Sequence, residues 1–164
     1  MKIGNIKPLD PREEVAPIPR ENGPTLYFTF KSSISSDKAR ELADKALKKN
    51  GSSIIRPGGV VEEITVDQNK RVELIMAINF IKSLNSVYLI EKDENDQPIH
   101  VEQPISWEVV DFDDILTYPR YKEELESFGL TGGEISYLTI KATQVNMIDE
   151  DMVQKAREDF LASR

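Results

Sequence analysis

The chain contains no cysteine, and this absence excludes several kinds of site. A disulfide framework, a thiolate nucleophile and a zinc site built on cysteine all need a residue that is missing here. Histidine is scarce as well, since His100 is the single one among 164 residues. A lone histidine without a serine, aspartate or cysteine partner nearby usually has a structural role. We expect that role for His100.

Long apolar runs are also missing. The first residues, MKIGNIKPLDPREE, contain no apolar stretch of signal-peptide length. No later stretch approaches the roughly 20 apolar residues that a membrane-spanning helix needs. We therefore expect a cytoplasmic protein that has no membrane partner.

Positive charge is scarce in most of the chain. Residues 1–60 carry a net charge of +4 and residues 61–164 carry −12, which gives −8 overall. The acidic part would repel a nucleic-acid backbone, and the scattered lysines of the first part fit a solvated helix face. We expect no nucleic-acid partner.

The length and the spacing of apolar residues predict an α+β fold. A chain of 164 residues fits one domain, or one domain with an arm. Residues 1–24 hold five of the nine prolines, which predicts an extended arm. We expect residues 25–164 to form a single, mostly helical domain that has a few N-terminal and central β-strands and ends in a pair of capped helices.

Local patterns place the elements of this domain. The alternation in TLYFTFKS predicts a strand over 25–32. Helices are predicted over about 36–50 and over about 68–85; the second begins after Asp67 and is apolar on most sides, which is typical of a core helix. Further elements are predicted as follows: a strand over 60–66, two short strands within 87–102, and a helix around Pro119 that buries Tyr121, Leu125 and Phe128 and ends at Gly129.

Three segments have some features of a ligand site. The RPGG run at 56–59 lacks the Gly-Lys-Ser/Thr ending of a phosphate loop, so a plain turn is the better interpretation. The acidic KDENDQ at 92–97 lacks the glycine and spacing of a calcium loop and fits a hairpin tip. The close carboxylates of Asp111, Asp113 and Asp114 suit a metal or acid–base chemistry, but they also suit the first turn of a helix beginning near Phe112. We favour the helix start and expect no catalytic, cofactor-binding or metal-binding residue and no cofactor.

The last third of the chain, residues 130–164, is the most clearly specified. Thr131 and Glu134 form a predicted capping box at the start of a helix that ends near Asn146. Asp149 is expected to cap a second helix. The apolar spacing predicts that Val153, Ala156 and Phe160 of this second helix face inward.

Because this segment has helix signals and no catalytic chemistry, we expect it to bind another protein. The partner-binding residues that we select are Met152, Phe160 and Leu161, since a C-terminal helix can leave apolar side chains for a partner. The alternative is that all three side chains close the core of their own domain.

The order of these segments resembles the small tail assembly chaperones of bacteriophages. The resemblance rests on the Pro-rich start that leads into IPRENGPTLYFTF, the acidic middle, and the ending FGLTGGEI…N…IDEDMVQKAREDFL, and it is strongest over 121–162. It implies a cytoplasmic factor of phage or prophage morphogenesis that binds a tail component, such as the tape-measure or tail-tube protein, without a cofactor and without turnover.

Two other functions stay open on the sequence. One is a structural or adaptor module that interacts with proteins and remains in a particle. The other is an enzyme that uses His100 with Asp111, Asp113 and Asp114. An active site needs convergent groups with perturbed pKa values, and one histidine without a motif makes the enzyme the least favoured of the three.

Overall fold

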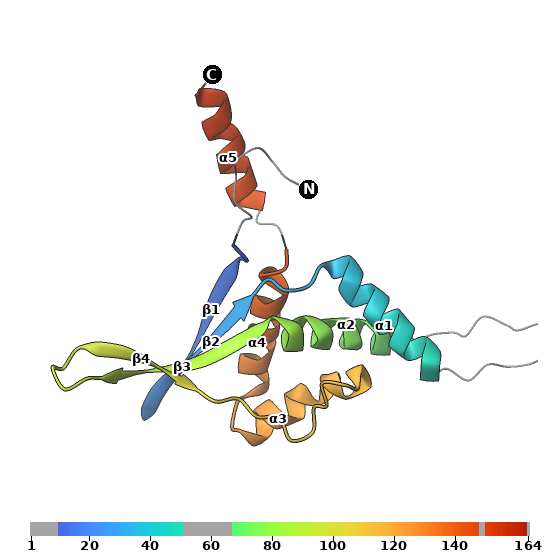
Figure 1. The fold of residues 1–164 in the computed structure, drawn as a ribbon, viewed down its shortest axis with the longest axis horizontal. Coiled ribbons are helices and arrows are strands. Elements are labelled where there is room, and N and C mark those ends of the chain that lie inside the picture. Colours follow the sequence, from blue (N-terminus) through green and yellow to red (C-terminus); the bar gives the residue numbers. More distant parts are fainter. Residues whose placement is uncertain (1–9, 51–66, 148–149, 164) are drawn as a thin grey trace, which may run out of the picture.

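The computed structural model describes residues 10–50, 67–147 and 150–163. The predicted turn at 57–59, the predicted strand over 60–66 and the predicted cap at Asp149 lie outside these residues. The described part is an α+β structure with a four-stranded antiparallel sheet (Figure 1). The strands are β1 (Glu13–Arg20), β2 (Gly23–Lys31), β3 (Leu84–Lys92) and β4 (Pro98–Gln103), and they lie side by side in the order β1-β2-β3-β4.

Helices make up most of the rest of the described chain. They are α1 (Ser36–Asn50), α2 (Gln68–Ser83), the 3₁₀ helix η1 (Ile115–Arg120), α3 (Tyr121–Ser127), α4 (Gly132–Gln144) and α5 (Glu150–Ala162). Helix α4 packs against β1, β2 and α2, and α2 also packs against α1 and η1. The predicted α+β mixture with a helical C-terminal region is therefore confirmed. The sheet is larger than predicted, since it has four strands in one antiparallel sheet.

The sheet begins earlier in the chain than the sequence predicts. Within the predicted arm over 1–24, residues 13–20 form β1, which pairs with β2 from Glu13↔Lys31 to Arg20↔Gly23. The side chains of Ala16 and Ile18 are buried in the core. The boundary at residue 25 is therefore wrong, because it falls inside the β1–β2 hairpin. Prolines are compatible with this strand because β1 lies at the edge of the sheet.

The core lies where α2, α3 and α4 meet the buried face of β1 and β2. Phe30 of β2 meets the ring of Phe80 in α2 edge to face, with 5.5 Å between the centroids. Phe80 in turn stacks on Tyr121 of α3 at 4.3 Å, and the Tyr121 hydroxyl lies 2.7 Å from Thr139 Oγ1 of α4. These contacts tie four elements together, and burial of the rings removes a large apolar area from water.

Most of the predicted caps are confirmed. Asp67 accepts hydrogen bonds from the backbone N–H groups of Asn69 and Lys70 at the start of α2, and Thr131 and Glu134 form the capping box of α4. Gly129 has a φ of 103°, the left-handed conformation that suits glycine at a helix end. Phe128 was expected to face inward, but its side chain is 69% exposed. The chain turns at Gly129 and directs the next buried contact to Leu130 instead.

The β3–β4 hairpin extends beyond the rest of the sheet (Figure 1). Tyr88 is the last residue of β3 for which the described pairing includes a β2 partner, whereas β3 and β4 stay paired as far as Lys92↔Pro98. The acidic segment predicted as a hairpin tip does connect these strands, and Asp93 Oδ1 accepts hydrogen bonds from the backbone N–H groups of Asn95 and Gln97. The outer half of the hairpin is thus a two-stranded ribbon.

Candidate functional site

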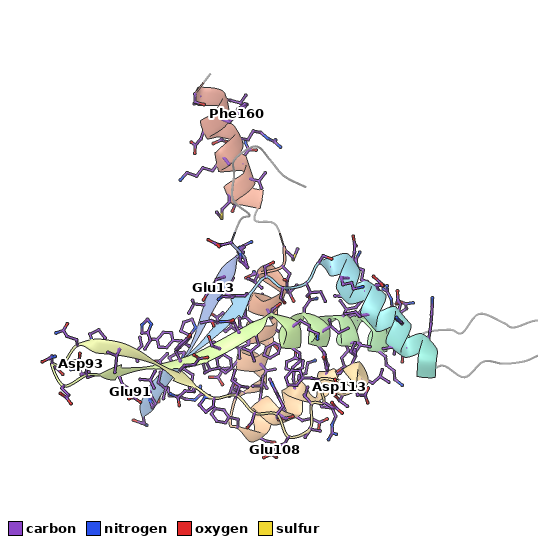
Figure 2. All side chains as sticks on the ribbon, in the orientation of Figure 1. Glu13, Glu91, Asp93, Glu108, Asp113 and Phe160 are labelled. Atoms are coloured by element: carbon purple, nitrogen blue, oxygen red, sulfur yellow. The ribbon has the colours of Figure 1, made fainter. Side chains whose placement is uncertain are left out.

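Helix α5 carries the three residues that the sequence selects for partner binding. The exposed fractions are 67% for Met152, 61% for Phe160 and 59% for Leu161. Every residue from 151 to 163 is exposed. Figure 2 shows Phe160 on a helix that stands apart from the sheet and from the other helices.

The apolar side chains of α5 share one side of the helix. At about 100° per residue, Met152, Val153, Ala156 and Phe160 fall within a sector of roughly 100°. Leu161 lies about 80° beyond Val153, with Arg157 between them. Most of the remaining positions carry charged or polar residues. The helix is therefore amphipathic, and its apolar stripe faces solvent in this chain.

This arrangement corrects the predicted role of the helix. We expected Val153, Ala156 and Phe160 to face inward, yet Val153 is 40% exposed and the other two are exposed as well. The alternative in which Met152, Phe160 and Leu161 close the core is also wrong. The physical reason is that the core is already closed by α4, in which Ile135, Leu138 and Ala142 are buried.

The point where the chain leaves the body toward α5 is held by Asn146. Its Nδ2 group donates to Ser83 Oγ at 2.6 Å and to the Ala142 carbonyl at 3.1 Å, and Asn79 Oδ1 lies 3.4 Å away. Its Oδ1 accepts from the Ser33 backbone N–H at 3.2 Å. One side chain thus joins α2, α4 and the segment after β2.

Arg12 adds a further bond at the next residue. Its Nη1 donates to the Met147 carbonyl at 2.8 Å, so the segment before β1 holds the same end of α4. The last described residues before α5 are consequently attached to the body by several bonds.

The residues of the enzyme hypothesis do not gather at one place. His100 lies on β4 in the hairpin, exposed, with its ring 6.3 Å from that of Tyr88. Asp111, Asp113 and Asp114 lie in the loop before η1, where Asp111 Oδ1 accepts from the Asp113 N–H at 2.9 Å. Asp114 caps η1 through the Leu116 N–H, so the favoured role as a helix start holds for it, three residues later than expected. Over the described ranges, acidic and histidine side chains form no group suited to a metal ion.

The structure also has a shallow depression in its surface, and neither His100 nor the three aspartates line it. It runs along α1 and is lined by Glu41, Asp44, Lys45 and Lys48. Asp44 forms an ion pair with Arg71 of α2, with 2.6 Å between Asp44 Oδ1 and Arg71 Nε, and this hydrogen bond lowers the pKa of Asp44. The pair links α1 to α2, which is a structural role.

The sequence analysis did not identify Glu124, a carboxylate whose pKa is lowered in the folded protein. Glu124 of α3 accepts hydrogen bonds from the backbone N–H groups of residues 108, 109 and 110 at 2.9, 2.7 and 2.8 Å. Burial alone would raise the pKa of Glu124, but these three donors stabilise the charged form and lower it. Glu124 therefore holds the loop that follows the hairpin. No local pattern marks it, because its partners are 14–16 residues away.

Comparison of the chain with family models, with curated proteins and with solved structures finds no match. Within the described residues, no helix combines the length and the apolar character that crossing a membrane would require.

Proposed function

We propose that this chain is a non-enzymatic assembly factor for the tail of a phage or prophage, and that it binds a tail component through α5. The observation that carries the proposal is the exposure of the apolar stripe of α5, with Met152 and Phe160 both more than 60% exposed. The resemblance of residues 121–162 to tail assembly chaperones supplies the class of partner, for which the tape-measure and tail-tube proteins are the candidates.

The physics of short helices supports a partner on this stripe. An isolated helix of 13 residues is marginal in water, and most helical stability comes from packing of an amphipathic face. An amphipathic helix that enters an apolar groove is a common mode of protein recognition. The net charge of −8 also favours solubility of a complex with an apolar client. We place this factor in the cytoplasm, and its action needs no cofactor.

The experiment is co-purification with the tail-tube and tape-measure proteins encoded in the same genome. The variant Met152→Ser/Phe160→Ser removes the two most exposed apolar side chains of the stripe. The variant Lys155→Ser is the matched control on the polar side of the same helix. We expect the double variant to lose the client and the control to keep it, with unchanged thermal unfolding in both.

Retention of neither candidate protein by the unmodified chain would rule out the proposed client. Equal retention by both variants would show that α5 is not the contact surface. The second candidate function, an adaptor that remains in a particle, uses the same exposed stripe. It is separated from an assembly factor by probing purified particles for the chain, since an assembly factor leaves before maturation.

A further inference from the structure

The two edges of the sheet differ in how well they are protected. The backbone N–H of Ser32 donates to the Arg12 carbonyl at 2.8 Å, which makes this a hydrogen-bonded pair of the β1–β2 ladder. Such pairs alternate with non-hydrogen-bonded pairs in an antiparallel ladder. With the observed register, residue 17 therefore directs its backbone toward the free edge of β1. Pro17 has no N–H there, and the pairing is irregular between Ile18 and Arg20, so this edge is poorly suited to a further strand.

The other edge, formed by β4, carries no further strand among the residues that the structure describes. The N–H of Asp93 donates to the Gln97 carbonyl at 2.9 Å, so pairs of odd-numbered residues carry the hydrogen bonds between β3 and β4. His100 and Glu102 consequently direct their backbone N–H and carbonyl groups away from β3. Both residues are exposed, and β4 is the last strand of the sheet in the described part of the chain. An unpaired row of donors and acceptors on an edge strand is a template for another strand.

We propose that two copies of the chain pair antiparallel through β4, around a two-fold axis at Val101, to form one continuous sheet. In this register His100 of one copy lies opposite Glu102 of the other, twice. These are hydrogen-bonded pairs, and each sets an imidazole N–H donor beside a carboxylate acceptor. Pro98 lies opposite Pro104, the residue after β4. Neither proline has an N–H, so the hydrogen-bonded pairing ends there and the two carbonyls stay open to solvent.

The shape of the hairpin suits such a partner. Figure 1 shows the outer part of β3 and β4 extending away from the helices. Apolar side chains lie on both faces of the ribbon, with Ile90 42% and Ile99 41% exposed. A two-stranded ribbon is marginal in water, and added strands stabilise it. The self-complementary register of β4 identifies the second copy as the occupant.

The absence of cysteine makes the register directly testable in the full chain. Val101→Cys places one thiol on the two-fold axis, in a non-hydrogen-bonded pair whose Cα atoms lie about 4.5 Å apart, within the range for a disulfide. We expect mild oxidation to give a covalent dimer. Ile99→Cys is the matched control, because its thiols would be roughly 13 Å apart along the strands. Failure of Val101→Cys to cross-link, or equal cross-linking of both variants, would overturn the register.

The second measurement is the oligomeric state by sedimentation over a range of concentrations. His100→Glu sets glutamate opposite glutamate and should weaken the dimer on the order of tenfold, whereas His100→Glu/Glu102→Lys should restore it.

His100→Pro removes an outward backbone donor from β4 and should weaken the dimer. Val15→Pro, which removes an outward donor from the β1 edge, should not. A monomeric unmodified chain, or a dimer insensitive to the β4 variants, would overturn the proposal. The variants leave α5 unchanged, so this outcome is independent of client binding.

Discussion

Glu134 and Arg20 join the start of α4 to the end of β1. The Arg20 guanidinium donates to both carboxylate oxygens of Glu134, and one of these oxygens also accepts the Thr131 backbone N–H of the capping box at 2.8 Å. A local helix signal and a long-range contact therefore use the same side chain. This is the place where the edge strand β1 is fixed to the helical layer.

Replacement of Glu134 by glutamine separates the two roles. Glutamine can keep the capping box but not the charge, so we expect the free energy of unfolding to fall by about 0.5–1 kcal/mol, since solvent screens a partly exposed pair. The hydrogen bond from Arg20 lowers the pKa of Glu134, so its contribution is present at neutral pH and is lost as pH falls through the lowered pKa. Denaturant unfolding at pH 7 and pH 3 should show a smaller difference for Glu134→Gln than for the unmodified chain.

Glu124→Gln should have a larger effect. The carboxylate accepts three backbone N–H groups, and an amide offers one acceptor oxygen in their place. We expect a loss of about 1–3 kcal/mol at pH 7. Because the pKa of Glu124 is lowered in the folded state, this loss should shrink as the medium is acidified through that pKa. Thermal unfolding against pH provides the measurement, with the exposed Glu126→Gln as control, and equal effects of the two variants would contradict the assigned role.

Asn146 and Ser83 are expected to be energetically coupled. Ser83 is 1% exposed, and its hydroxyl accepts a hydrogen bond from Asn146 Nδ2 at 2.6 Å. Asn146→Ala leaves the buried Ser83 hydroxyl without its partner, at a cost of about 1–3 kcal/mol. Ser83→Ala should cost less, because the half-buried Asn146 amide keeps the Ala142 carbonyl and Asn79 Oδ1 as acceptors. The double variant should therefore lose less stability than the two single variants added together, by about 0.5 kcal/mol or more. Strict additivity in a double-mutant cycle would show that the bond contributes nothing to folding.

Removal of α5 should leave the rest of the protein folded. A chain ending at Met147 keeps Asn146 and its bonds and, among the described residues, loses only a helix whose side chains are exposed. We expect its melting temperature to change little, because exposed residues away from such bonds contribute roughly 0.5 kcal/mol or less. A chain ending at Gly129 is the contrast, since it lacks the buried face of α4 and should unfold. Unfolding of the longer truncation would mean that α5 is structural.

Elements whose signals lie within a few residues were predicted well from the sequence. The Asp67 cap, the Thr131–Glu134 box and the strand β2 are confirmed, because each depends on bonds or packing set by neighbouring residues. The alternating exposure predicted for β2 is not seen at Thr29, which is buried between Phe28 and Phe30. Strand β1 was not predicted, because the prolines at 17 and 19 favoured an extended arm outside the sheet. Only the partner strand shows that this segment is an edge, where a missing N–H can be tolerated.

The apolar stripe of α5 was predicted for the same reason, and whether it binds a partner stays a prediction. Periodicity over 152–160 shows that α5 has an apolar stripe, and the selected Met152, Phe160 and Leu161 are on that helix and exposed. Periodicity does not show what covers such a stripe. The prediction that Val153, Ala156 and Phe160 face the body was wrong, because that orientation depends on whether the core is already full.

By itself the sequence determined the amphipathic helices, their caps, the strand alternation and the acidic charge, since these follow from bonds and packing over one or two turns of chain. The tertiary structure alone decided that α4 closes the core, that α5 leaves it and that β4 is the last strand of the sheet among the described residues. It also decided that Glu124 and Asn146 are anchors. These features depend on groups far apart in the sequence, and their pairing is set by how the whole chain packs.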